Sequence, residues 1–110
     1  MHISSVAILA LLASGVAAQH NVRIQGTNVN ARECPHTGCK SLTKLSNKTV
    51  YGVCQTRGEL VKNSNGYEND WWSKVVIGAS KTAWVSNLYI QGGRKIAGIP
   101  DCSPCKQESC

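Results

Sequence analysis

The sequence DWWSKVVIGASKTAWVSNLYI, at residues 70–90, decides the expected fold because it holds all three tryptophans of the chain. Residues 71–77 and residues 82–85 are rich in aromatic and β-branched side chains, which favour β-strands. The segment between them, Gly78-Ala79-Ser80-Lys81, is typical of a turn. We therefore expect a β-hairpin that supplies half of the hydrophobic core and the floor of a binding face.

Trp71 and Trp72 have different roles because adjacent residues of a strand point to opposite faces of the sheet. We expect Trp72 to point inward and Trp71 to point outward. An exposed indole ring is suited to stacking on a sugar ring or an apolar side chain. The alternative is that a loop such as residues 63–69 covers the second face of the strand.

Residues 1–18 have the pattern of a secretory signal peptide. Residues 3–18 are apolar or small and carry no charge, and Val16-Ala17-Ala18 offers the small residues that signal peptidase recognises. The stretch is short for a membrane span, and no second apolar run follows it. We expect cleavage before Gln19 and a secreted protein, extracellular or associated with a cell wall, without a membrane span.

All six cysteines follow residue 18, and an even cysteine count in a small secreted chain indicates disulfides. A domain of this size is marginally stable without such cross-links. Six cysteines allow many connectivities, and the sequence does not select one. The working assignment is a guess that pairs Cys34 with Cys39, which bracket a short loop, Cys54 with Cys102, and Cys105 with Cys110.

Outside the hairpin, the chain indicates further short strands separated by turns. Residues 28–32 alternate polar and apolar side chains, residues 49–54 are rich in β-branched residues, and residues 59–62 are extended. Residues 55–58 are expected to form a turn. No segment has a sustained helical period, so the expected fold is all-β: a small barrel or sandwich of about five to seven short strands, stabilised by disulfides.

This pattern divides the chain into a signal peptide, a barrel at residues 19–92 and a tail at residues 93–110. Glycine and proline in the tail argue against a strand there, and the tail carries three of the cysteines. We expect it to pack on the barrel or to trail from it, and we expect a monomer.

The formal net charge of +6 favours anionic or carboxylate-bearing partners outside the cell. The lysines and arginines are scattered and form no stripe at helical spacing, so we expect no nucleic-acid partner. A basic, soluble surface without a specific role is the plainer explanation of this charge.

Catalytic and metal chemistry have weak signals. Glu68 and Asp70 are the carboxylates near the aromatic hairpin, and a pair of carboxylates is the usual machinery of glycan hydrolysis. A raised carboxyl pKa needs an apolar pocket, for which a domain of this size has little room. Cys102-x-x-Cys105 is a single pair with zinc-like spacing in an oxidising compartment, which favours disulfides. We therefore expect no catalytic residue, no metal and no cofactor.

Three surface features complete the candidate residues. Asn47-Lys48-Thr49 fits the N-glycosylation sequon, which makes Asn47 a candidate glycan acceptor. Strand parity places Tyr51 on the face opposite Cys54, the outer face if Cys54 lies inside. Tyr67 lies in an otherwise polar segment, either as a lid on the core or as a contact residue.

Taken in order, these residues resemble bacterial-type SH3 (SH3b) domains over about residues 22–92. The segment Asn28-Val29-Asn30-Ala31-Arg32 is similar to the opening of that family. Trp72-Ser73-Lys74-Val75, followed by residues 82–90, resembles its closing pattern. Secreted SH3-like cell-wall-binding modules of fungi are more similar still, since they share the cysteine before Gln55 and a tail resembling residues 98–102. Ala83 replaces the usual glycine before Trp84, and the Cys34–Cys39 loop stands where the family places part of its ligand groove.

The resemblance implies a small SH3-like β-barrel that binds cell-wall polymer, either peptidoglycan or a chitin-type glycan, without catalysis. The expected ligand-binding residues are an aromatic platform with polar residues beside it: Trp71, Tyr67, Trp84 and Tyr51, together with Asn28, Asn30 and Arg32. Two alternatives from other classes remain. One is a small muramidase-like enzyme that uses Glu68 or Asp70, and the other is a secreted effector that binds a partner protein through the same hairpin.

Overall fold

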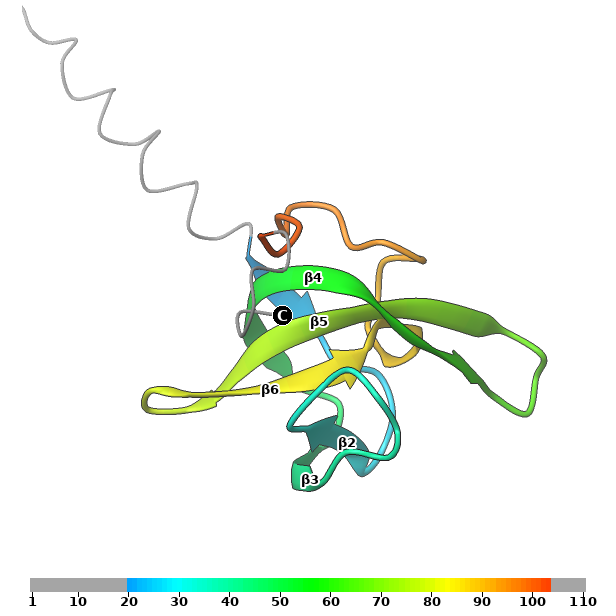
Figure 1. Cartoon of the computed structure of the whole chain (residues 1–110), viewed down its shortest axis with the longest axis horizontal. Coiled ribbons are helices and arrows are strands. Elements are labelled where there is room, and N and C mark those ends of the chain that lie inside the picture. The colour runs from blue at the N-terminus through cyan, green and yellow to red at the C-terminus, as the bar shows by residue number, and fades with distance from the viewer. Residues whose placement is uncertain (1–19, 104–110) are drawn as a thin grey trace, which may run out of the picture.

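The computed structural model describes residues 20–103, which form one curled antiparallel sheet of six strands (Figure 1). The strand order across the sheet is β1-β4-β5-β6-β2-β3. The elements are β1 (Asn21–Arg23), β2 (Val29–Arg32), β3 (Ser41–Leu45), β4 (Thr49–Lys62), β5 (Glu68–Gly78), β6 (Lys81–Ser86) and a 3-10 turn, η1 (Asn87–Tyr89).

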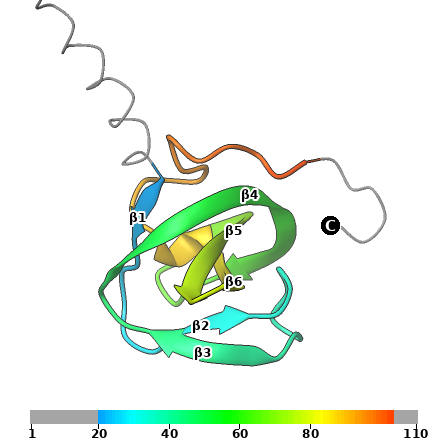
Figure 2. The same cartoon turned by 90° about the vertical axis from the view of Figure 1, so that its left-hand side faces the viewer.

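The predicted all-β class and strand number are confirmed, and the sheet curls into a partial barrel (Figure 2). The Cys34–Cys39 and Cys54–Cys102 disulfides of the working assignment are present. The predicted signal peptide and the predicted Cys105–Cys110 pair lie outside the described residues. Within residues 20–103, no helix is long and apolar enough to cross a membrane.

The predicted hairpin is confirmed as β5 and β6, which pair from Trp72 opposite Ser86 to Gly78 opposite Lys81, with a register shift between Val76 and Gly78. The turn places Ser80 at a φ of 57°, in the left-handed region. Val75, Ala83 and Val85 are completely or almost completely buried and form the centre of the apolar core. The hairpin therefore supplies a large part of the core, as its composition predicts.

Strand β4 runs without interruption through residues 55–58, so the predicted turn there is wrong. Gly58 suggested a turn, but its role is to allow close packing. A Cβ atom at this position would lie 2.5 Å from the carbonyl oxygen of Pro35 and 2.9 Å from Cδ1 of Trp72. Glycine is therefore required by a close approach between segments distant in the sequence, which a local pattern does not reveal.

A β-bulge in β4 determines which side chains reach the interior. Gly52 pairs with Val75 and Cys54 pairs with Lys74, so β4 has one extra residue between these pairs. Val50 and Gly52 point inward before the bulge, and Gln55 points inward after it. The simple alternation used to predict the inner face therefore ends at residue 53.

The segment from Gly93 to Ser103 packs back onto the barrel, held by the buried side chain of Gln55, which is 1% exposed. The Gln55 Nε2 donates to the carbonyl oxygens of Ile96 and Ile99, each at 2.9 Å. Its Oε1 accepts from the backbone N–H of Ile96 at 2.9 Å and from Asn87 Nδ2 at 3.1 Å. Ile96 and Ile99 are themselves buried in the core, so this part of the tail belongs to the barrel.

We predict that Gln55→Ala lowers the free energy of unfolding by about 3 kcal/mol or more, because it leaves several buried polar groups without partners. Denaturant titration with the disulfides intact measures this loss. The control is Gln91→Ala, which removes an exposed amide side chain. The backbone N–H of Gln91, which donates to the Arg23 carbonyl oxygen, is kept in this variant. Equal stability of the Gln55→Ala protein and the wild type would contradict the prediction.

Candidate functional site

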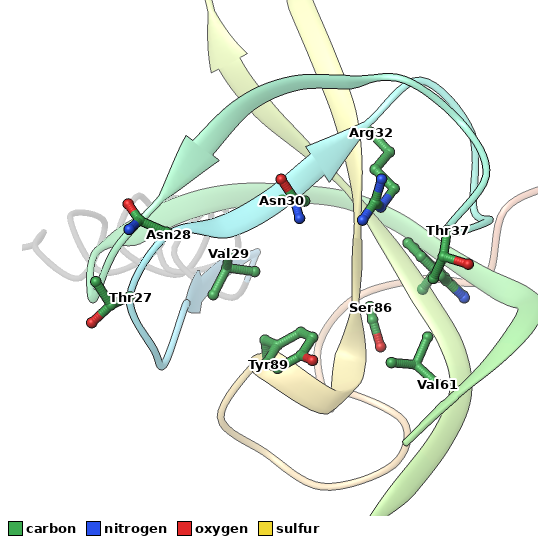
Figure 3. A pocket seen from close by; sticks show the side chains of 10 residues that line it. Thr27, Asn28, Val29, Asn30, Arg32, Thr37, Val61, Ser86 and Tyr89 are labelled. Atoms are coloured by element: carbon green, nitrogen blue, oxygen red, sulfur yellow. The ribbon is translucent and has the colours of Figure 1, made fainter. Parts of the chain in front are cut away.

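A groove of about 190 Å³ opens between β2, the Cys34–Cys39 loop, the middle of the sheet and η1 (Figure 3). Its lining combines apolar side chains with a small number of polar ones, which is the usual composition of a ligand site. The lining residues are Thr27, Asn28, Val29, Asn30, Arg32, Thr37, Val61, Trp72, Ser86 and Tyr89.

The apolar part of the groove comes from Val29, Val61, Trp72 and Tyr89, which belong to four different elements. Figure 3 shows Val29 on β2 facing Tyr89 on η1. The Trp72 ring is fixed because its Nε1 donates to the Glu59 carbonyl oxygen at 2.9 Å. A rigid aromatic wall lowers the entropy cost of binding a ring or an apolar group.

The polar rim presents hydrogen-bond donors to the groove. Arg32 is half-buried, and its Nη1 donates to the Cys39 carbonyl oxygen at 3.0 Å, which leaves further guanidinium donors for a ligand. Asn30 Oδ1 accepts from Ser41 Oγ and from Lys44 Nζ, each at 2.9 Å. The Asn30 amide nitrogen lies on the groove side in Figure 3. This rim therefore fits a ligand that supplies acceptors, such as carboxylate or amide oxygens.

The Cys34–Cys39 loop forms one end wall of the groove and is held there by Glu59. The backbone N–H of Thr37 donates to Glu59 Oε1 at 2.5 Å, and its hydroxyl donates to the same oxygen at 2.7 Å. His36 Nδ1 lies 3.2 Å from this carboxylate. The hydrogen bonds from Thr37, side chain first, lower the pKa of Glu59. Thr37 is the loop residue that lines the groove, so the loop bounds the groove and leaves it open.

Three of the seven predicted ligand-binding residues, Asn28, Asn30 and Arg32, lie together in this groove. Asn28 has a φ of 54°, and its backbone N–H donates to Ser46 Oγ at 2.8 Å. Asparagine tolerates this left-handed backbone better than most residues. The opening segment of the barrel therefore brings these three polar side chains to one groove.

The four predicted platform aromatics have separate surroundings and do not form one face. Trp71 lies beside Arg57 and Lys95, and Trp84 lies beside Lys74. Tyr51 is 42% exposed and stacks on His20 at a ring-centroid distance of 5.3 Å.

Tyr67 is 68% exposed, so it does not act as a lid on the core. It lines a second, more open hollow with Glu68 and Arg94.

The expected difference in exposure between the two tryptophans is confirmed, since Trp72 is 2% exposed and Trp71 is only partly buried. Trp72 is nevertheless outside the main apolar cluster and forms a wall of the groove. Sequence analysis assigned it to the core and missed its second role, together with Tyr89, Val61 and Ser86. The available signal was the resemblance of residues 72–75 and 82–90 to the closing SH3b pattern, which covers Trp72, Ser86 and Tyr89 but not Val61.

The carboxylates near the hairpin are engaged in ion pairs. Asp70 Oδ2 accepts from Arg57 at 3.0 Å, and Asp70 Oδ1 accepts from Arg94 at 3.2 Å. The hydrogen bond from Arg57 is the main cause that lowers the pKa of Asp70, whereas a general acid near neutral pH needs a raised one. Glu68 lies 3.8 Å from Lys62 and is exposed. The environment of Asp70 does not favour this residue as a proton donor.

The remaining candidate features are the glycosylation sequon at Asn47 and a metal site. Asn47 is exposed in the turn between β3 and β4, where its Oδ1 accepts from the Gly26 backbone N–H at 3.0 Å. Within residues 20–103, no group of three or more His, Cys, Asp or Glu side chains is placed to hold a metal ion.

We predict that the Cys34–Cys39 loop loosens in acid as Glu59 is protonated. Because the folded pKa of Glu59 is lowered, its contribution to stability is complete above the ordinary value of about 4.3 and is lost as the pH falls through the lower, folded value. An NMR titration of the Glu59 carboxyl carbon and the Thr37 amide measures both events. In Glu59→Gln the Thr37 amide should stay constant over this pH range. A Glu59 midpoint at or above the ordinary value would contradict the prediction.

No protein-family model, curated protein or solved structure matches this chain. A function therefore has to be inferred from the groove itself.

Proposed function

We propose that this protein is a secreted, non-catalytic SH3-like module that binds a cell-wall polymer, peptidoglycan or a chitin-type glycan, in the groove between β2 and η1. The observation that carries this proposal is the groove's composition. The groove has aromatic and aliphatic walls, which include Trp72 and Tyr89. Beside these walls lies a rim of hydrogen-bond donors, which includes Arg32. Rings with amide, hydroxyl and carboxylate substituents match both parts.

The size of the groove and the charge of the chain also support a polymer ligand. A groove of about 190 Å³ holds one ring or side chain and not a long oligomer, so each copy makes few contacts. We expect single-site dissociation constants on the order of micromolar to millimolar. A repeating polymer compensates for weak sites by offering many of them, and a net charge of +6 attracts an anionic wall.

The resemblance to SH3b domains and the disulfides point in the same direction. Disulfides persist in oxidising compartments, which agrees with secretion to the outside of the cell. Asn28, Asn30 and Arg32, which belong to the segment that resembles the opening of the family, line the groove.

We predict that Arg32→Ala removes most retention on insoluble wall polymer. Sedimentation with purified peptidoglycan and with chitin measures the bound fraction. Arg23→Ala is the matched control, because it removes the same side chain from an exposed position on β1 outside the groove. Tyr51→Ala tests the aromatic platform expected from the sequence. Because Tyr51 lies outside the groove, this variant should be retained like wild type. If wild-type protein is retained on neither polymer, the proposed function is wrong, and if Arg32→Ala is retained like wild type, the groove is not the site.

A further inference from the structure

Arg32, Trp84 and Lys74 form a row across three adjacent strands. Arg32 of β2 is directly opposite Trp84 of β6, and Trp84 is directly opposite Lys74 of β5. Residues directly opposite each other project from the same face of a sheet and lie side by side. The Lys74 ammonium lies 5.5 Å from the centroid of the Trp84 ring, and all three side chains are partly buried.

This row continues the floor of the groove. Trp72 and Ser86 line the groove and are themselves directly opposite each other. Lys74 and Trp84 are each two residues away along the same strands, and side chains two apart share a face. Arg32 belongs to both features, because it lines the groove and also begins the row. A polymer seated in the groove can therefore extend past Arg32 onto Trp84 and Lys74.

The cations of the row are available to a ligand. Among residues 20–103, neither Arg32 nor Lys74 forms an ion pair with a carboxylate. The positive charge of Arg32 helps to lower the pKa of Glu59, but the two residues form no ion pair. The Glu59 carboxylate oxygens instead accept hydrogen bonds from Thr37 and lie close to His36. Partly desolvated cations without counter-ions attract anions more strongly than fully solvated ones.

Trp71 provides an internal comparison because it also lies between two cations. Lys95 is 4.7 Å and Arg57 is 5.9 Å from its ring centroid. Both of these cations are neutralised, Arg57 by Asp70 at 3.0 Å and Lys95 by Asp101 at 2.8 Å. The Trp71 cluster therefore helps to attach the tail. The Trp84 row also combines one tryptophan with one arginine and one lysine, but the charges of its Arg32 and Lys74 are not paired with a carboxylate among residues 20–103.

We propose that Arg32, Trp84 and Lys74 form an anion-selective extension of the groove, and that the wall polymer it binds is a glycan carrying carboxylates on its chain. This inference rests on the proposed function and names the class of its ligand. Arg32 and Lys74 are two strand spacings apart, roughly 10 Å, so they can hold successive carboxylates along one glycan. The Trp84 ring between them provides an apolar wall for the intervening sugar.

The test compares two soluble polymers that share one backbone, carboxymethyl chitin, which carries carboxylates, and glycol chitin, which is neutral. We expect the wild type to bind carboxymethyl chitin at least about tenfold more tightly, a preference that added salt weakens through screening. Lys74→Gln should weaken this binding roughly three- to tenfold, as expected for loss of one charge-assisted contact, and Lys74→Glu should weaken it further. Binding to glycol chitin should not respond to either change.

Lys95→Gln is the matched control, because it removes the same charge beside Trp71, the other partly buried tryptophan. We expect its affinity for carboxymethyl chitin to change less than about twofold, since Lys95 is already paired. Thermal unfolding of each variant confirms that the fold is intact. Equal affinity for both polymers, or equal losses in Lys74→Gln and Lys95→Gln, would overturn the anion-selective row while leaving the proposed function in place. Binding to neither polymer and no retention on peptidoglycan would refute the proposed function as well.

Discussion

The structure depends on the hydrogen bonds of one buried amide, the side chain of Gln55. A buried amide is tolerated only when its donors and its acceptor all have partners, and here the tail and η1 supply them. The bulge before Cys54 turns this side chain inward. Without the bulge, strand alternation would place an apolar or small side chain inside, and the segment after η1 would have no polar anchor in the barrel.

The same interaction fixes the position of the groove. Asn87 connects Gln55 to Ser73 of β5, whose hydroxyl donates to Asn87 Oδ1 at 2.6 Å. Asn87 begins η1, and Tyr89 at its other end forms a groove wall. Trp72, the adjacent wall, is next to Ser73 on the other face of β5. A polar network on the inner face of the sheet therefore determines where the aromatic walls of the groove stand.

Sequence reasoning was reliable where local chemistry decides the structure. The β5–β6 hairpin, the alternation at residues 28–32 and the opposite orientations of Trp71 and Trp72 follow from side-chain type and strand parity. It failed where distant segments decide. Gly58 is needed by Pro35 and Trp72, and the bulge in β4 reverses the inner face after Val53. The aromatic side chains predicted to form one platform lie apart for a related reason, since strand pairing, which composition does not show, places Trp71 and Trp84 on opposite faces of the sheet.

The Cys54–Cys102 disulfide, which joins residues 48 positions apart, has a consequence for how firmly the tail is held. Cys102 is brought beside β4 by the seated segment from Ile96 to Pro100 and by the hydrogen bond of its own backbone N–H to the Gln55 carbonyl oxygen at 2.8 Å. The bond therefore ties the end of the tail to β4 beside Gln55. Breaking the hydrogen bonds of the Gln55 amide cannot by itself release the tail from the barrel, because the disulfide still tethers it until the bond is reduced.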